Sequence, residues 1–172
     1  MKPFEHFQFC PRCGKPRSEE PTDKMFHCRS CEFVYYFNPA IGAAAFVINP
    51  AGDVLFIQRA SEPAKGKLAL PGGFVDAGET IEYGLAREIR EEVNLEVSGF
   101  QYLCSGPNEY QYKNVTYSVL DLFFIAKVES GEGARAMDGV ASYNWLPPSR
   151  VDPQDIAFKS IRDALRRLLS RV

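Results

Sequence analysis

Short apolar runs separated by turn-forming residues fill the middle of the chain and predict a β-sheet. The runs at residues 41–48 and 54–57 flank Asn-Pro-Ala-Gly-Asp at 49–53, an order that predicts a β-hairpin. Further strands are predicted at residues 67–70, 96–104 and 115–128, and a last one ends at Trp145-Leu146 ahead of two prolines. The run at 120–126 has one polar interruption, Asp121, and we expect its strand to lie deep in the sheet.

Two segments have the spacing of amphipathic helices. Between residues 80 and 93, where successive positions turn by about 100°, one stripe carries Ile81, Leu85, Ile89 and Val93. Residues 154–171 predict a second helix, whose apolar side carries Ile161, Leu165, Leu168 and Val172. We expect this last helix to pack on the sheet. A glycine-rich connection at 129–139 precedes the final strand.

The composition is that of an ordinary soluble globular protein, with 45% hydrophobic and 24% charged residues. With 172 residues, the chain is long enough for one catalytic core and a small appendage. No run approaches the roughly 18 apolar residues of a membrane span, and residues 1–6 lack the apolar segment of a secretory signal. We therefore expect a cytoplasmic protein with no membrane partner.

The net charge limits which ligands the chain can hold unaided. At −2, it provides no basic field for a polyanion, so bulk nucleic-acid binding is not expected. Bound phosphates would need the help of metal ions.

Four of the five cysteines form two Cys-x-x-Cys pairs near the N-terminus: Cys10, Cys13, Cys28 and Cys31. The pairs are separated by 14 residues, close to the spacing of paired zinc knuckles, and Gly14 supplies the positive φ that such a turn uses. Four thiolates leave no open coordination position, so a zinc ion here would be structural. Two separate redox dithiols are the alternative. Cys104 is expected to be a small buried apolar residue, and His6 and His27 to be non-ligands.

The helix predicted at 80–93 carries an unusual set of carboxylates. Glu88 and Glu92 are four residues apart and share one face, and Glu91 is three residues from Glu88, so three carboxylates fall within about one turn. Like charges at this spacing repel, whereas Mg²⁺ or Mn²⁺ would convert the repulsion into coordination by oxygen ligands. Glu91 points further from the apolar stripe than the other two. A solvated acidic helix is the competing interpretation.

The residues around this helix support the metal interpretation. Gly72 and Gly73 lie between a strand and the loop that leads into the helix, and they allow a backbone carbonyl to approach a metal or a phosphate closely. Arg87 can pair with Glu79 across the loop or with Glu91 on the next turn. Either pairing would orient a carboxylate without touching substrate.

The segment resembles the Nudix box, Gly-x5-Glu-x7-Arg-Glu-U-x-Glu-Glu-x-Gly-U, in which U is a bulky apolar residue. The prescribed positions are filled by Gly73, Glu79, Arg87, Glu88, Ile89, Glu91, Glu92 and Leu95. The one departure is Asn94 in place of glycine, and asparagine is the next-best residue for the left-handed conformation that ends a helix. With the lead-in at residues 66–73, the resemblance covers most of residues 41–172.

The resemblance implies an α/β fold, a Nudix-type α/β/α sandwich with a mixed sheet, at residues 39–172, with the zinc ribbon at 1–38. It also implies a pyrophosphohydrolase that cleaves a nucleoside diphosphate derivative and releases a nucleoside monophosphate. Mg²⁺ or Mn²⁺ would be held by Glu88 and Glu92, with Glu91 and the Gly72 carbonyl as further ligands. On family grounds Arg87 pairs with Glu79.

The general base differs among members of the family. Glu91 is one option, and Glu132 or Asp138 from the 129–139 loop is another. Arg59 resembles a position that reaches substrate phosphate, with a surface ion pair as the alternative.

A zinc ribbon ahead of a Nudix core is similar to the NADH pyrophosphatase branch, but the Ser-Gln-Pro-Trp-Pro-Phe-Pro stretch of that branch is replaced here by residues 105–112. ADP-ribose, a nucleotide sugar or another dinucleotide is therefore at least as plausible a substrate as NADH. Tyr110, Tyr112 and Tyr117 are candidates to stack on a base or to pack on the sheet.

A function of another class is also open: a zinc ribbon that binds RNA or protein, carried on a non-catalytic Nudix scaffold. The complete carboxylate set argues against it. Residues 1–40 contain 6 Lys and Arg against 5 Asp and Glu, which is too little positive charge for a dedicated phosphate-binding surface. The oligomeric state is left open, with a homodimer among the alternatives.

Overall fold

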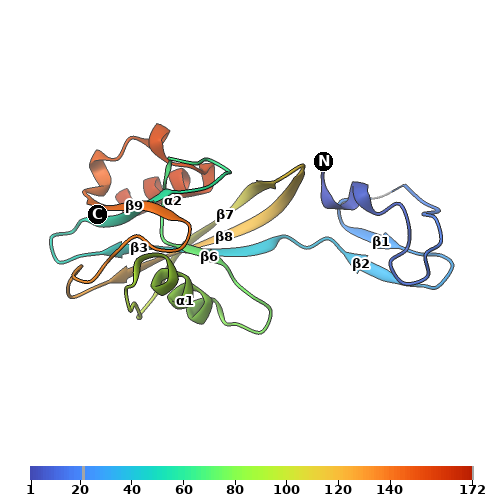
Figure 1. Cartoon of the computed structure of the whole chain (residues 1–172), viewed down its shortest axis with the longest axis horizontal. Coiled ribbons are helices and arrows are strands. Elements are labelled where there is room, and N and C mark those ends of the chain that lie inside the picture. The colour runs from blue at the N-terminus through green and yellow to red at the C-terminus, as the bar shows by residue number, and fades with distance from the viewer. Residues whose placement is uncertain (21, 172) are drawn as a thin grey trace.

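The computed structural model describes residues 1–20 and 22–171. The chain has two parts, a small N-terminal unit and a larger sheet flanked by helices (Figure 1). The N-terminal unit contains a 3-10 helix, η1 (Pro3–His6), and a two-stranded antiparallel sheet of β1 (Met25–His27) and β2 (Val34–Tyr36). It lies at one end of the molecule, beyond the tip of the long β7–β8 hairpin (Figure 1).

The larger sheet has seven strands, in the order β5-β4-β3-β8-β7, with β6 paired to β3 and β9 paired to β4. The strands are β3 (Ala40–Ile48), β4 (Val54–Arg59), β5 (Leu68–Ala69), β6 (Gly72–Phe74), β7 (Gln101–Tyr112), β8 (Val115–Lys127) and β9 (Val140–Leu146). β3 and β8 run parallel along nine residue pairs, whereas the other pairings are antiparallel. The sheet is therefore mixed.

Two α-helices flank this sheet on opposite sides, α1 (Ile81–Val93) against β3 and β6 and α2 (Lys159–Leu169) against β7 (Figure 1). The Thr80 hydroxyl accepts a hydrogen bond from the Tyr83 N–H and caps the start of α1. Asn94 ends the helix with a φ of 57°, the left-handed conformation expected of it. Two short 3-10 helices, η2 (Pro148–Arg150) and η3 (Pro153–Asp155), precede α2. The α/β/α sandwich with a mixed sheet is confirmed.

The hydrophobic core fills both sides of the sheet. Its largest fully buried side chains include Phe46, Phe56 and Phe123 from the strands and Leu85 and Ile89 from α1. The helical stripe contributes as expected, with Leu85, Ile89 and Val93 buried. Of the stripe expected in the second helix, Ile161, Leu165 and Leu168 are buried, while Val172 lies outside the described residues. No helix in the described part of the chain is long and apolar enough to cross a membrane.

Two of the predicted elements were wrong in extent. The strand expected at 96–104 is β7, which begins at Gln101 and continues to Tyr112. The expected hairpin is present, since β3 and β4 pair antiparallel across residues 49–53, with Ile48 opposite Val54. The last helix begins at Lys159, five residues later than expected, since Pro153 belongs to a separate 3-10 turn.

Candidate active site

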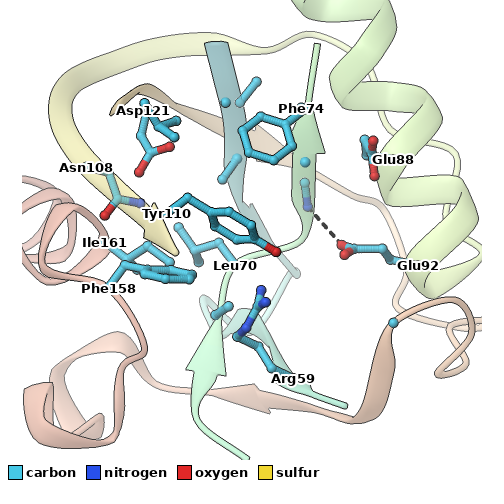
Figure 2. Close-up of a pocket in the computed structure, with 18 of the residues that line it drawn as sticks. Arg59, Leu70, Phe74, Glu88, Glu92, Asn108, Tyr110, Asp121, Phe158 and Ile161 are labelled. Carbon is cyan, nitrogen blue, oxygen red and sulfur yellow. Dashed lines mark hydrogen bonds between the residues drawn. The ribbon is translucent and has the colours of Figure 1, made fainter. Parts of the chain in front are cut away.

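A cavity of about 400 Å³ opens beside β6 and reaches from α1 to α2 (Figure 2). Glu88 and Glu92 of α1 lie at one end of it, and Asn108 and Asp121 lie at the opposite end (Figure 2). Arg59 and the Tyr110 ring lie between these ends. The cavity therefore has two polar ends joined by a largely apolar middle.

The strand register explains why these side chains share the cavity. Gly42 of β3 pairs with Asp121 of β8, and Ala44 pairs with Phe123, so these residues lie on one face of the sheet. Asn108 and Tyr110 of β7 lie on the same face, since they are two residues apart and Asn108 pairs with Val119. Small residues at 42 and 44 leave the room that the cavity occupies.

Glu92 lies at the edge of the core, and its carboxylate is fixed by the backbone. The Gly72 N–H donates to the Glu92 Oε2 atom at 2.9 Å. Burial raises the pKa of Glu92 to about 8, although the Gly72 hydrogen bond and the charge of Arg59 oppose the shift. Glu92 therefore holds its negative charge at a cost unless a cation approaches it.

Glu88 is close to the backbone of β6. A Cβ atom at Gly73 would lie 2.5 Å from the Glu88 carboxyl carbon, so only glycine leaves room for this carboxylate. Burial also raises the pKa of Glu88, and the ion pair with Arg87 opposes that effect. Gly72 has a different constraint, because its φ is 137° and a Cβ there would lie 2.2 Å from the Ala43 carbonyl oxygen of β3.

Arg87 joins the carboxylates around α1. Its Nε and Nη2 atoms donate to the two oxygens of Glu79 at 2.8 and 3.0 Å, and its Nη1 donates to Glu88 at 2.9 Å and to Glu91 at 3.1 Å. Nη2 also donates to the Phe74 carbonyl at 3.3 Å. The hydrogen bonds from Arg87 lower the pKa of Glu79 to about 2. Both pairings considered from the sequence, with Glu79 and with Glu91, are present.

The structure does not gather all three carboxylates of the helix into one cluster. The Glu91 side chain is 48% exposed and turns to Arg87, whereas Glu88 and Glu92 line the cavity. Among the described residues, the only group of three or more Cys, His, Asp or Glu side chains placed to hold one ion is the cysteine group. The ion pair with Arg87 holds the Glu91 side chain outside the cavity.

The residues expected to bind substrate divide into two groups. Gly73, Arg59 and Tyr110 line the cavity, and the Arg59 guanidinium lies 5.2 Å from the centroid of the Phe158 ring while its Nε donates to the Pro63 carbonyl at 2.7 Å. Tyr112 lies elsewhere. It is exposed, near the tip of the β7–β8 hairpin, with the Lys113 ammonium 5.4 Å from its ring centroid.

Two acids in the 129–139 loop were considered as general bases, and they differ in their surroundings. The Asp138 N–H donates to the Glu91 carbonyl at 3.3 Å, and the negative charge of Asp138 contributes to the raised pKa of Glu92. The neighbouring Gly139 lines the cavity. Glu132 is exposed at the loop's turn, where its N–H donates to the Ser130 hydroxyl at 3.0 Å. The structure therefore brings Asp138, and not Glu132, towards the carboxylates.

Sequence reasoning missed the far end of the cavity. Asn108, Asp121, Phe158 and Ile161 line it, and the first two provide its polar groups. The only signal in the sequence was Asp121 itself, a single carboxylate within the apolar run of β8.

The four N-terminal cysteines come together as expected from their spacing. Their Sγ atoms all lie within 4.8 Å of one another, a four-cysteine cluster compatible with a zinc ribbon. Gly14 follows the first pair with a φ of 71°, and Glu32 follows the second pair with a φ of 55°. The N–H groups of these two residues donate to the Cys10 and Cys28 carbonyls. The two pairs thus have the same turn.

The thiols of this cluster influence each other strongly. Burial raises the pKa of Cys10, but hydrogen bonds from the Cys13 and Arg12 backbone and from neighbouring thiols outweigh it and lower the pKa to about 7. The pKa of Cys31 is raised to about 12, because burial and the three other thiols outweigh the backbone hydrogen bond at Phe33. A cation is therefore needed for all four to ionise together. Cys104 lies apart, in β7.

Comparison with known proteins identifies relatives along most of the chain. The family model of the NUDIX domain matches residues 38–168. The NAD-capped RNA hydrolase NudC of Pseudomonas fluorescens is 30% identical over 149 residues, which cover 87% of this chain and 51% of that protein. NudC of Chromobacterium violaceum is 31% identical over 170 residues, covering 96% of this chain and 61% of that protein. The chain thus spans roughly half to three-fifths of the length of these curated relatives.

Solved structures show the same fold. A NUDIX hydrolase from Nitrosomonas europaea superimposes with a TM-score of 0.70 and 26% identity, over 95% of this chain and 91% of that one. The NUDIX domain of Shewanella oneidensis NrtR, solved in complex with ADP ribose, has a TM-score of 0.63 and 20% identity, over 78% of this chain and 88% of that one. The first similarity includes the N-terminal part of the chain.

Proposed function

Because the chain belongs to the NUDIX family, we propose that it is a hydrolase that depends on divalent metal ions and cleaves the pyrophosphate bond of a nucleoside diphosphate derivative. The products would be a nucleoside monophosphate and a second phosphorylated fragment. ADP-ribose, a nucleotide sugar and a dinucleotide are the substrates to be tested.

One observation carries this proposal. Glu88 and Glu92 lie at one end of a cavity that also contains Arg59 and the Tyr110 ring (Figure 2). The volume, about 400 Å³, falls in the range of roughly 300–1,000 Å³ that is usual for small-molecule sites. Carboxylates can hold a metal ion that binds the diphosphate, a cationic side chain can contact a phosphate, and an apolar surface can contact the base.

The donor set at this end of the cavity fits a hard divalent cation. Glu88 and Glu92 have raised pKa values caused by burial, and a nearby cation would reverse both shifts. Mg²⁺ or Mn²⁺ bound there supplies neutralisation of the diphosphate charge and a lowered pKa for an attacking water. Glu88 and Glu92 are the proposed ligands, with the Gly72 carbonyl and Glu91 as further candidates.

The other side chains have supporting roles. Arg87 holds Glu79, Glu88 and Glu91 in place and is a positioning residue, since all three accept its hydrogen bonds. Arg59 would contact a substrate phosphate, because it lies in the cavity close enough for its charge to lower the pKa of Glu92. Gly73 leaves room for Glu88.

The general base remains a choice between Glu91 and Asp138. One Glu91 oxygen already accepts a hydrogen bond from Arg87 at 3.1 Å, and the Glu91 side chain does not line the cavity. Asp138 lies next to Gly139, which lines the cavity, and no Arg87 hydrogen bond holds it. Asp138 is therefore the preferred candidate, and Glu132 is not favoured.

The N-terminal residues 1–38 are proposed to form a zinc ribbon and residues 39–172 the catalytic domain. The NUDIX match begins at residue 38, which supports this division. A zinc ion bound by Cys10, Cys13, Cys28 and Cys31 would be structural, since all four of its positions would be sulfur.

A second candidate substrate follows from the names of the relatives. The NudC proteins of Pseudomonas fluorescens and Chromobacterium violaceum are NAD-capped RNA hydrolases, so an RNA with a dinucleotide cap belongs in the test as well as NADH. Residues 105–112 replace the Ser-Gln-Pro-Trp-Pro-Phe-Pro stretch of the NADH pyrophosphatase branch and lie in β7 beside the cavity. This difference supports a base-binding surface unlike that of the branch.

A substrate panel tests the proposal. NADH, ADP-ribose, nucleotide sugars, diadenosine polyphosphates and NAD-capped RNA are incubated with Mg²⁺ or Mn²⁺, and nucleoside monophosphate or uncapped RNA is measured. We expect metal-dependent release from at least one small-molecule substrate. Release from none of them would refute the proposed hydrolase, and cleavage of capped RNA alone would make RNA the substrate.

A further inference from the structure

Two polar side chains, Asn108 and Asp121, stand at the end of the cavity farthest from Glu88 and Glu92 (Figure 2). They come from neighbouring strands and lie on the same face of the sheet, since Asn108 pairs with Val119, two residues from Asp121 along β8. The surrounding lining, including Val119, Phe123 and Ile161, is apolar. A polar pair in such a setting needs hydrogen-bond partners.

The Ser160 hydroxyl uses only part of the hydrogen-bonding capacity of the Asp121 carboxylate. The Ser160 hydroxyl of α2 donates to the Asp121 Oδ2 atom at 2.6 Å. The Oδ1 atom lies over Gly42, where a Cβ would be only 2.6 Å away. Because Gly42 has no side chain, there is room for the Asp121 Oδ1 atom in the lining of the cavity.

Burying the charged Asp121 carboxylate at this position is energetically unfavourable. Burial raises the pKa of Asp121, although hydrogen bonding to Ser160 and Asn108 opposes the shift. A carboxylate that served only to connect β8 to α2 could be replaced by a neutral hydrogen-bonding group without this cost. Its position in the lining of the cavity allows a ligand to donate a further hydrogen bond to it.

The orientation of Asn108 is also fixed by its surroundings. The Glu109 N–H donates to the Asn108 Oδ1 atom at 2.9 Å, so Asn108 donates through its amide nitrogen. This nitrogen carries two N–H groups, so one can hydrogen-bond to Asp121 and the other is available to a ligand. Asn108 thus offers an N–H group beside the acceptor oxygens of Asp121. A donor next to an acceptor is the complement of the edge of adenine that carries its amino group and a ring nitrogen.

Between the two polar ends, the cavity provides an apolar surface for flat rings. The Tyr110 and Phe158 rings lie 6.4 Å apart between centroids at an angle of 42°. Phe74 holds Tyr110 edge-on at 5.5 Å, and Arg59 lies over Phe158. From one end to the other, the cavity thus offers carboxylates, a cation, aromatic rings and then a hydrogen-bonding pair (Figure 2). A nucleotide could therefore place its phosphates near the carboxylates and Arg59, and its base against the aromatic rings with the polar edge of the base at Asn108 and Asp121.

We propose that Asp121 and Asn108 form a base-recognition subsite for a base with an exocyclic amino group beside a ring nitrogen, as in adenine, with Asp121 accepting from the amino group and Asn108 donating to the ring nitrogen. The inference rests on the proposed function, because it names the base of the same substrate. Ser160 is a positioning residue that holds the Asp121 carboxylate.

Binding of two nucleotides that differ only in the amino group tests the subsite. AMP and purine riboside 5′-monophosphate are titrated by calorimetry into the full chain with Mg²⁺. We expect AMP to bind about tenfold more tightly or better, the value of a hydrogen bond to a charged acceptor. In Asp121→Ala the two affinities should become equal within about twofold.

A matched control separates recognition from structural support. Ser160→Ala loses the same link between β8 and α2 but keeps the carboxylate, so the preference for AMP should fall by less than in Asp121→Ala. Asp121→Asn, which is nearly the same size, provides a folded variant in which the preference should shrink. An equal affinity of the wild-type protein for both nucleotides, or an unchanged preference in Asp121→Ala, would overturn the inference.

Turnover of ADP-ribose and of its analogue without the amino group is measured in parallel. Metal-dependent hydrolysis without base preference would overturn the subsite and leave the proposed function standing. Base-selective binding of AMP without hydrolysis of any pyrophosphate would support the subsite and overturn the proposed function.

Discussion

The Gly72 N–H of β6 donates a hydrogen bond to the Glu92 carboxylate of α1 at 2.9 Å. This bond joins the glycine-containing strand to the helix at the edge of the cavity. Because Glu92 is largely buried, the bond fixes the direction in which its second oxygen faces. The proposed metal site therefore depends on a contact between strand and helix as well as on the helix itself.

The raised pKa of Glu92 predicts how pH affects the stability of the protein without Mg²⁺ or Mn²⁺. The folded-state pKa, about 8, lies above the ordinary value for glutamate, so the folded protein holds this proton more tightly than the unfolded chain. The stabilisation is fully present below about pH 4.3 and is lost as the pH rises towards 8. We therefore expect the free energy of unfolding of Glu92→Gln, relative to that of the wild-type protein, to be higher at pH 8 than at pH 5.5 by about 1–3 kcal/mol.

Urea unfolding of both proteins at the two pH values, with zinc retained and no Mg²⁺ or Mn²⁺, measures this difference. Glu96→Gln is the control, since Glu96 is exposed and follows α1. An identical pH dependence for wild type and Glu92→Gln would show that Glu92 titrates normally.

Arg87→Lys should weaken the site without unfolding the chain. Lysine cannot reproduce the bidentate contact with Glu79 or reach Glu88 and Glu91 at the same time. We expect metal affinity or kcat/KM to fall about 10- to 100-fold, the usual effect of losing a residue that orients metal ligands. Arg90→Lys, at an exposed position of the same helix, should leave both quantities unchanged.

The same substitution changes the titration of a neighbour. Glu79, whose pKa is held at about 2 by Arg87, should titrate closer to the ordinary range in Arg87→Lys. NMR titration of the Glu79 carboxyl carbon follows this change. A Glu79 pKa that stays near 2 in the variant would mean that Arg87 is not its cause.

Gly73→Ala tests the close approach of β6 to Glu88. The new methyl group would lie 2.5 Å from the Glu88 carboxyl carbon, so the carboxylate must move. We expect a loss of Mn²⁺ affinity of about 10- to 100-fold with the fold retained, because the displaced atoms belong to the end of a side chain. Gly106→Ala is the control, since the nearest atom to its methyl group lies at 3.8 Å. Unaltered Mn²⁺ binding in Gly73→Ala would remove Glu88 from the site.

The four-cysteine cluster predicts one zinc ion per chain. Cys13→Ser replaces one thiolate and should lower the zinc content measured by metal analysis, with loss of ordered NMR signals from residues 1–38. Cys104→Ser should retain a full equivalent of zinc, because Cys104 lies in β7, away from the cluster. Full zinc content in Cys13→Ser would contradict a four-thiolate site.

Local patterns predicted the elements whose signals are local. The apolar stripe of α1 and its left-handed Asn94 follow from spacing and from side-chain chemistry within one segment. The cysteine turns are equally local. The strand β7 was misplaced because Leu95 and Val97 are buried without belonging to a strand, while Pro107 lies inside one. Proline is tolerated there because β7 is at the edge of the sheet.

The far end of the cavity could not be predicted because it depends on long-range register. Asp121 meets Gly42 through the parallel pairing of β3 with β8, and it meets Ser160 through the packing of α2. Neither relationship leaves a periodic pattern in the sequence. The separation of Glu91 from Glu88 and Glu92 likewise depends on Arg87. The sequence offered Glu79 and Glu91 as alternative partners of Arg87, whereas the structure pairs it with both.

If Glu88 and Glu92 hold divalent ions against a bound diphosphate, Glu92→Gln must bind Mn²⁺ more weakly than the wild-type protein. Wild type, Glu92→Gln and the Glu96→Gln control are titrated with Mn²⁺ in the presence of nucleotide, and ADP-ribose turnover is recorded for each. We expect Glu92→Gln to bind Mn²⁺ at least about tenfold more weakly and to lose turnover, with an unchanged fold by circular dichroism. Wild-type Mn²⁺ affinity together with full turnover in Glu92→Gln would contradict the account.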